Sequence, residues 1–136
     1  MQKPPWFRRT LLATALMNVA GFVSFLPPFP AARVLAGLPE VSHPLYAWVV
    51  ALWILLFGIA YGRLAFLDTQ ERLFVQIGAA GKCAFFCLLV GFTLRGELPS
   101  WAPLAGVGDL LFAGLFLLWL WQTRSAPSAA AMTDQA

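Results

Sequence analysis

Two charged residues, Lys82 and Asp109, each lie near the middle of a long apolar segment of the chain, in residues 73–94 and 100–122. Each segment is long enough to cross the hydrocarbon core of a bilayer, which takes about 20 residues. A lone Lys or Asp at the centre of a bilayer costs about 2.5–3.5 kcal/mol on insertion scales. We therefore expect each charge to have a partner inside the protein.

The short link between the two segments predicts a helical hairpin that brings these charges together. Measured from the middle of the link, Lys82 and Asp109 lie at depths that differ by roughly 4–5 Å, at 1.5 Å of rise per residue. A lysine side chain can cover this offset. Two interpretations remain open for the pair: it sets the register of the two helices, or it belongs to a ligand site or a proton path.

Two uncharged polar residues could join the pair. Asn18 lies in the middle of the apolar segment 10–26, and Gln76 lies near the start of the segment 73–94. With ordinary helix tilt, the depths of Asn18, Lys82 and Asp109 converge on one level of the bundle, and Gln76 is a further candidate. We therefore predict a polar pocket of these four residues as a ligand or proton site, without assigning a catalytic role to any of them.

The composition indicates which elements hold this pocket. The chain has 136 residues, of which 60% are hydrophobic and 11% charged, whereas soluble domains carry about 25% charged residues. The apolar segments predict an all-α polytopic membrane protein, with four transmembrane helices in an up-down bundle. We expect one domain, residues 1–122, and a disordered cytoplasmic tail, residues 123–136. The expected spans are residues 10–26, 44–62, 73–94 and 100–122.

The basic residues predict the orientation. In a four-span protein, one side holds six of them and the other side holds two, Arg33 and Arg95. The six are Lys3, Arg8, Arg9, Arg63, Arg72 and Arg124. The positive-inside rule then places both termini in the cytoplasm, in a multi-pass protein of the bacterial inner (plasma) membrane. We interpret the net charge of +3 as topology and not as nucleic-acid binding. We also expect the first helix to be retained, because no convincing A-x-A cleavage site follows it.

The sequence offers no metal or cofactor motif. Cys83 and Cys87 are four positions apart within one apolar segment, which is neither a C-x-x-C motif nor a zinc pattern. A single histidine, His43, cannot form a multi-histidine centre. The segment from Gly78 to Lys82 has no Ser or Thr after the lysine and is not a phosphate-binding loop. We therefore expect no metal and no cofactor.

Two short motifs carry a resemblance to a known group of proteins. They are Gly78-Ala79-Ala80-Gly81-Lys82 and Gly108-Asp109-Leu110-Leu111-Phe112-Ala113. Over residues 63–122 the chain resembles small, mostly uncharacterised four-helix bacterial inner-membrane proteins of the DoxX-like kind. This resemblance implies a four-helix bundle and carries no catalytic residues with it.

Three functions are compatible with these features. The first is a non-enzymatic bundle with an accessory or assembly role or a site for a small hydrophobic ligand. The alternative is a membrane enzyme acting on a sterol, quinone or isoprenoid, with Asp109 as acid/base and Lys82 stabilising an anion. A proton-coupled small transporter is the third. The expected partners are membrane lipids, a hydrophobic small molecule, and a second copy or another membrane protein.

Overall fold

The computed structural model describes residues 3–69 and 71–124, and it is helical throughout, with no strand in these residues. The long helices are α1 (Pro5–Phe25), α3 (Pro44–Phe66), α4 (Arg72–Leu94) and α5 (Val107–Gln122). The short ones are α2 (Ala31–Leu35) and the 3-10 helix η1 (Ala102–Gly106). The predicted all-α class is confirmed. The expected disordered tail, residues 123–136, lies almost wholly outside the described residues.

Prolines determine where several of these helices begin. Pro5 and Pro44 lie in the first turns of α1 and α3, where the missing N–H is not needed and φ is already helical. The His43 side chain also accepts a hydrogen bond from the Leu45 N–H at 3.1 Å. Pro103 lies in the first turn of η1, so the expected span 100–122 consists of a 3-10 turn that continues into α5.

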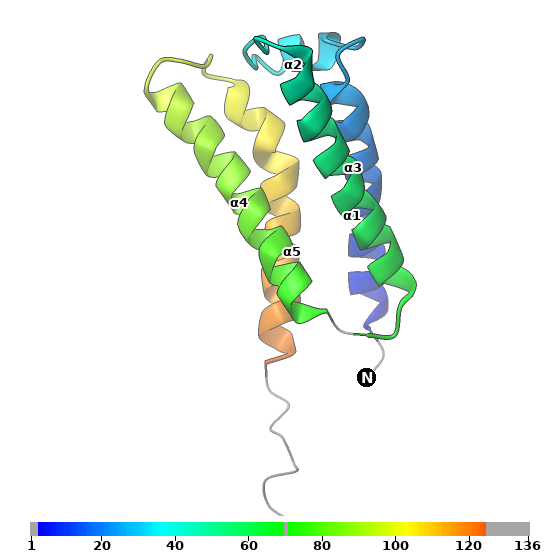
Figure 1. The fold of residues 1–136 in the computed structure, drawn as a ribbon. Coiled ribbons are helices and arrows are strands. Elements are labelled where there is room, and N and C mark those ends of the chain that lie inside the picture. Colours follow the sequence, from blue (N-terminus) through cyan, green and yellow to red (C-terminus); the bar gives the residue numbers. More distant parts are fainter. Residues whose placement is uncertain (1–2, 70, 125–136) are drawn as a thin grey trace, which may run out of the picture.

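The long helices form two antiparallel pairs (Figure 1). Helix α1 packs along α3, and α4 packs along η1 and α5, while the two pairs meet through α1 and α5. We call the end with the start of α1, the α3–α4 link and the end of α5 the basic end. The opposite end, which carries α2, is the α2 end. The two pairs stand side by side in Figure 1, with the α2 end at the top and the basic end at the bottom.

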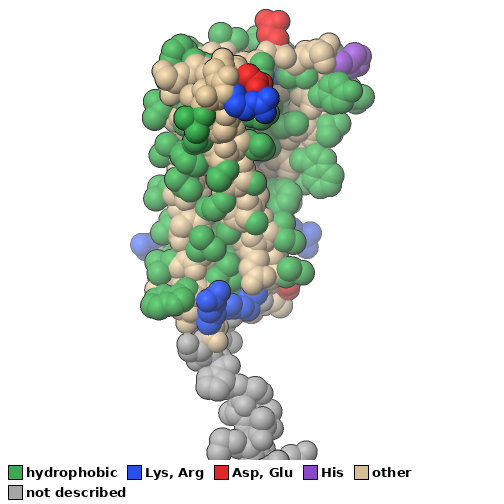
Figure 2. Space-filling view, turned by 90° about the vertical axis from the view of Figure 1, so that its left-hand side faces the viewer, with side chains coloured by type: hydrophobic (Ala, Val, Ile, Leu, Met, Phe, Trp, Pro, Cys, Tyr) green, Lys and Arg blue, Asp and Glu red, His purple; other side chains and the backbone are tan. Residues whose placement is uncertain are grey.

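Three helical stretches are long and apolar enough to cross a membrane: Pro44–Phe66, Arg72–Leu94 and Ala102–Gln122. Helix α1 has the length but is less apolar, because Arg8, Arg9 and polar residues interrupt it. Many large apolar side chains are exposed along the helices. On the face in Figure 2, charged side chains gather toward the two ends and hydrophobic ones cover the middle. This surface suits the interior of a membrane.

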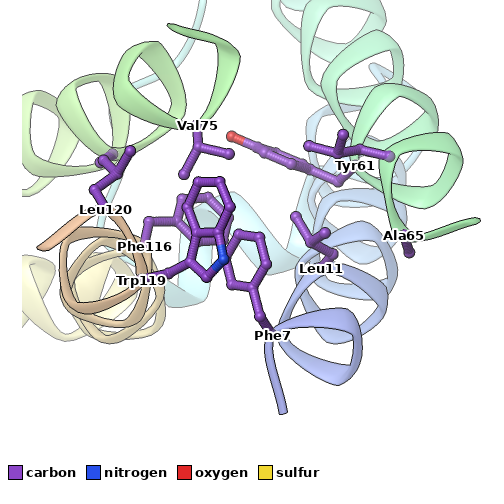
Figure 3. Close-up of a cluster of buried hydrophobic side chains, with 10 residues drawn as sticks. Phe7, Leu11, Tyr61, Ala65, Val75, Phe116, Trp119 and Leu120 are labelled. Atoms are coloured by element: carbon purple, nitrogen blue, oxygen red, sulfur yellow. The ribbon is translucent and has the colours of Figure 1, made fainter. Parts of the chain in front are cut away.

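A cluster of aromatic side chains joins the two pairs near the basic end (Figure 3). The rings of Phe7 and Trp119 stack with their centroids 4.2 Å apart. Phe116 lies 6.1 Å from Phe7 and 5.4 Å from Tyr61. Val75 of α4 and Leu11 of α1 complete the contact. These bulky residues fill the space between the pairs at this end.

Candidate functional site

A cavity of about 580 Å³ lies between the two helical pairs, on the α2 side of the aromatic cluster. Its walls come from residues between 17 and 25 of α1, between 50 and 61 of α3 and between 77 and 85 of α4. Ala105 of η1, Asp109 of α5 and residues in and after α2 also line it. Its volume falls in the range of about 300–1,000 Å³ that is typical of small-molecule pockets.

The ion pair that the hairpin register predicts is present on the wall of this cavity. Lys82 Nζ lies 2.5 Å from Asp109 Oδ1, and the exposed fractions of the two side chains are 9% and 22%. Lys82 shares one face of α4 with Gly78, four positions earlier, and both residues line the cavity. The pair therefore connects α4 to α5 and faces the space between the helical pairs.

The change from the 3-10 helix η1 to the α-helix α5 gives Asp109 a position that the sequence did not predict. Asp109 lies in the first turn of α5, whereas a continuous helix would have placed it in mid-helix. The N-terminal turn of a helix favours a negative charge, because its N–H groups point outward and the peptide dipoles align. The carboxylate is thus near the start of its own α-helix and is paired with the Lys82 ammonium.

Asn18 also lines the cavity and connects the two helices of the first pair. Its side-chain amide donates a hydrogen bond to the Ile54 carbonyl oxygen at 3.0 Å. Gly58 allows this approach, since a Cβ atom there would lie 3.0 Å from Asn18 Cβ. Asn18 is therefore a helix-packing residue that also contributes a polar group to the cavity.

The structure does not bring Gln76 to the other three predicted residues. Gln76 is exposed and is not among the residues that line the cavity. It precedes Lys82 by six positions, which places it on a different face of α4. A role for Gln76 in the pocket thus has no support in the geometry.

Tyr61 is a residue of the site that sequence reasoning missed. Near the end of an apolar segment, a tyrosine is typical of the membrane interface. In the structure Tyr61 is buried, lines the cavity, and has its ring centroid 5.9 Å from Lys82 Nζ. Its hydroxyl lies against Gly78, where an added Cβ atom would overlap the hydroxyl oxygen. The glycine at residue 78 is what lets this hydroxyl reach α4.

Replacing Gly78 by alanine is expected to lower the free energy of unfolding by about 2 kcal/mol, because the new methyl group overlaps the Tyr61 hydroxyl. Adding Tyr61→Phe removes that oxygen and should restore about half of the loss. The measurement is unfolding by SDS in mixed micelles, followed by helical circular dichroism. Gly91→Ala on the same helix is the control, since nothing lies within 4 Å of its added Cβ. Additive losses in the double variant would contradict the contact.

The polar groups around the cavity can hold a small uncharged polar group. Lys82 uses one of its three ammonium donors on Asp109. The second carboxylate oxygen of Asp109 and the Tyr61 hydroxyl add an acceptor and a further donor. Because the two charges of the pair balance, a hydroxyl or a carbonyl oxygen suits this wall better than a second ion.

The described residues contain no group of three or more His, Cys, Asp or Glu side chains that could hold a metal ion. Cys83 is half-buried and Cys87 is exposed, and both are free thiols. Comparison of the chain with family models, curated proteins and solved structures finds no match. The function is therefore inferred from the cavity and its polar groups.

Proposed function

We propose that the chain is a four-span protein of the bacterial inner membrane, with both termini in the cytoplasm and α1 as the fourth span. Helix α1 lies along α3 and contains an apolar stretch beyond Arg9 that is long enough for most of a crossing. The excess of basic residues at the basic end supports this orientation. A grouping with the DoxX-like proteins is a proposal of the same kind, supported by the two motifs that carry Lys82 and Asp109.

Within that membrane, we propose that the protein binds a small hydrophobic molecule in the cavity between the helical pairs and has no enzymatic activity. The observation that carries this proposal is one cavity of about 580 Å³ whose mainly apolar wall holds the Lys82–Asp109 ion pair. Apolar walls with a few placed polar groups are typical of sites for lipid-soluble ligands. The ligand classes that fit are sterols, quinones and isoprenoids, each with a hydroxyl or carbonyl group for the pair.

An enzyme acting on such a molecule is the second candidate, and Tyr61 is the observation that favours it. The Tyr61 hydroxyl, the Lys82 ammonium and the Asp109 carboxylate border one cavity, and together they could donate and accept a proton. Asp109 is, however, the one carboxylate among the described residues that line the cavity. A binding role needs no second acid and accounts for the same groups.

The test is native mass spectrometry of the purified protein, with identification of the small molecules that are retained. The wild type is expected to retain one defined non-phospholipid molecule. The double variant Lys82→Met/Asp109→Leu, which keeps the cavity wall without charges, should lose at least nine-tenths of it, because each hydrogen bond to a charged group contributes about 1.5–3 kcal/mol. Gln76→Ala is the matched control, since Gln76 is a polar residue of α4 outside the cavity.

The retained molecule also separates the two candidates. A ligand recovered chemically unchanged after incubation with wild-type protein supports binding alone, whereas conversion that depends on Tyr61 supports an enzyme. Recovery of the same bulk phospholipids from all three proteins would overturn the ligand site. The ion pair would then serve to fix the register of α4 and α5.

A further inference from the structure

Arg33 of α2 is a second charged group of the cavity. It lies at the α2 end and takes no part in the Lys82–Asp109 ion pair. It lines the main cavity and also a neighbouring one of about 190 Å³. Its Nε atom is buried and has no hydrogen-bond partner. A buried guanidinium N–H without an acceptor is costly, so this position is suited to an acceptor that the chain itself does not provide.

The acidic residues nearby in the fold do not neutralise Arg33. Glu40 lines the smaller cavity together with Arg33, but Glu40 is exposed and forms no ion pair with it. In the described residues the ion pairs are Lys82–Asp109 and Arg95–Glu97. Arg33 therefore presents an unbalanced positive charge to the cavity, in contrast to the balanced pair deeper inside.

The ion pair and Arg33 lie at different depths of the cavity, and the residues of α1 that line it measure the difference. Asn18 of α1 lies near the level of the ion pair, because its neighbour Met17 contacts Gly108, the residue before Asp109. Phe25 lies near the α2 end, and both Asn18 and Phe25 line the cavity. Seven residues of helix separate them, which corresponds to about 10 Å. The apolar wall between these levels includes Val50, Trp53 and Phe85. The cavity is thus elongated, with a neutral polar group in its depth and a positive charge at its α2 end.

The side of the cavity between α3 and α4 offers a route by which a hydrophobic ligand could enter. Trp53 and Ile77 line the cavity, yet 60% and 51% of their surfaces are exposed. Toward the basic end the same side is closed, because Phe57 and Tyr61 contact Phe74 at centroid distances of 5.8 and 5.1 Å. A molecule dissolved in the bilayer could therefore enter sideways without crossing water.

We propose that the ligand is a single-chain amphiphile whose acidic headgroup, a carboxylate or a phosphate, is bound by Arg33, while its apolar chain extends through the cavity and carries a hydroxyl or carbonyl oxygen to the ion pair. This inference rests on the proposed ligand site. A volume of about 580 Å³ suits one drug-sized molecule, which favours one chain. The guanidinium provides a planar set of donors that matches either acid.

The experiment measures binding of three twelve-carbon probes, dodecanol, dodecanoate and dodecyl phosphate, by native mass spectrometry at a pH at which both acids are ionised. Arg33→Gln is expected to weaken dodecanoate or dodecyl phosphate binding about ten-fold or more and to leave dodecanol binding unchanged. Arg33→Lys should retain part of the affinity. The acid that binds the wild type more tightly identifies the headgroup.

Arg95→Gln is the matched control, because Arg95 lies at the same end, pairs with Glu97 at 2.7 Å and is outside the cavity. Equal losses in the Arg33 and Arg95 variants would overturn the inference, since they would indicate general attraction of acids to this end. The inference would also be overturned if dodecanol binds and Arg33→Gln leaves the binding of dodecanoate and dodecyl phosphate unchanged. That result would leave the ligand site itself intact. Failure of all three probes to bind would count against the ligand site itself.

Discussion

Replacing Asp109 by leucine is expected to lower the free energy of unfolding by about 3 kcal/mol, because it leaves the Lys82 ammonium buried without its partner. The two side chains have exposed fractions of 9% and 22%, so water screens them little. The measurement is SDS-induced unfolding in mixed micelles. Breaking the exposed Arg95–Glu97 pair by Glu97→Gln provides the control, and it should change the free energy of unfolding by less than about 1 kcal/mol.

The double variant Lys82→Met/Asp109→Leu is expected to recover most of the stability lost by Asp109→Leu alone. Removing both members of a buried pair together leaves no uncompensated charge, and apolar side chains of similar volume can replace the contact. This recovery would separate the pair's effect on folding from its effect on ligand retention. A double variant as unstable as Asp109→Leu alone would contradict this recovery. A loss of stability in Asp109→Leu no larger than that in Glu97→Gln would contradict the cost expected for the unpaired lysine.

The second large effect is expected at the aromatic cluster that joins the two helical pairs. Phe7→Ala should lower the free energy of unfolding by about 3 kcal/mol, because it leaves a cavity beside Trp119 and Phe116 where α1 meets α5. The same SDS titration provides the measurement. Leu16→Ala is the control on the same helix, since 71% of the Leu16 surface is exposed, and its effect should stay within about 0.5 kcal/mol.

Combining Phe7→Ala with Trp119→Ala tests whether the stacked rings act as one contact. Their centroids are 4.2 Å apart with planes inclined by 3°, so each single variant already removes the stacking interaction. The double variant should therefore cost less than the sum of the two, by about 1 kcal/mol. Strict additivity would show that the rings stabilise the fold independently.

Much of the site could be predicted from the residue types and their spacing along the sequence. Helical segments were identifiable from long apolar runs, and the pairing of Lys82 with Asp109 followed from counting residues on either side of a short link. Asn18 was predicted as a polar residue of the pocket, and it lines the cavity while it donates a hydrogen bond to the Ile54 carbonyl oxygen. These inferences needed only the rise of a helix and the cost of an unpaired charge in an apolar medium.

Other features of the site depended on how the helices pack against each other, which residue spacing along one helix does not determine. Gln76 faces away from the cavity because of the rotation of α4, whereas Tyr61 reaches it because Gly78 leaves room on the opposing helix. Arg33 became part of the site when α2 folded over the α2 end of the cavity. The 3-10 helix before α5, which has Pro103 in its first turn, was not predicted, and its effect on the position of Asp109 became evident in the folded chain.

The sequence by itself thus determined the helical elements, their apolar character and the partner of each buried charge, because these depend on composition and on spacing along one or two adjacent helices. The tertiary structure decided that a cavity exists and which side chains face it. The physical reason is the difference in bulk between the two ends. Large rings fill the space between the pairs at the basic end, while on the α2 side of Tyr61 the side chains leave a volume of about 580 Å³ unfilled.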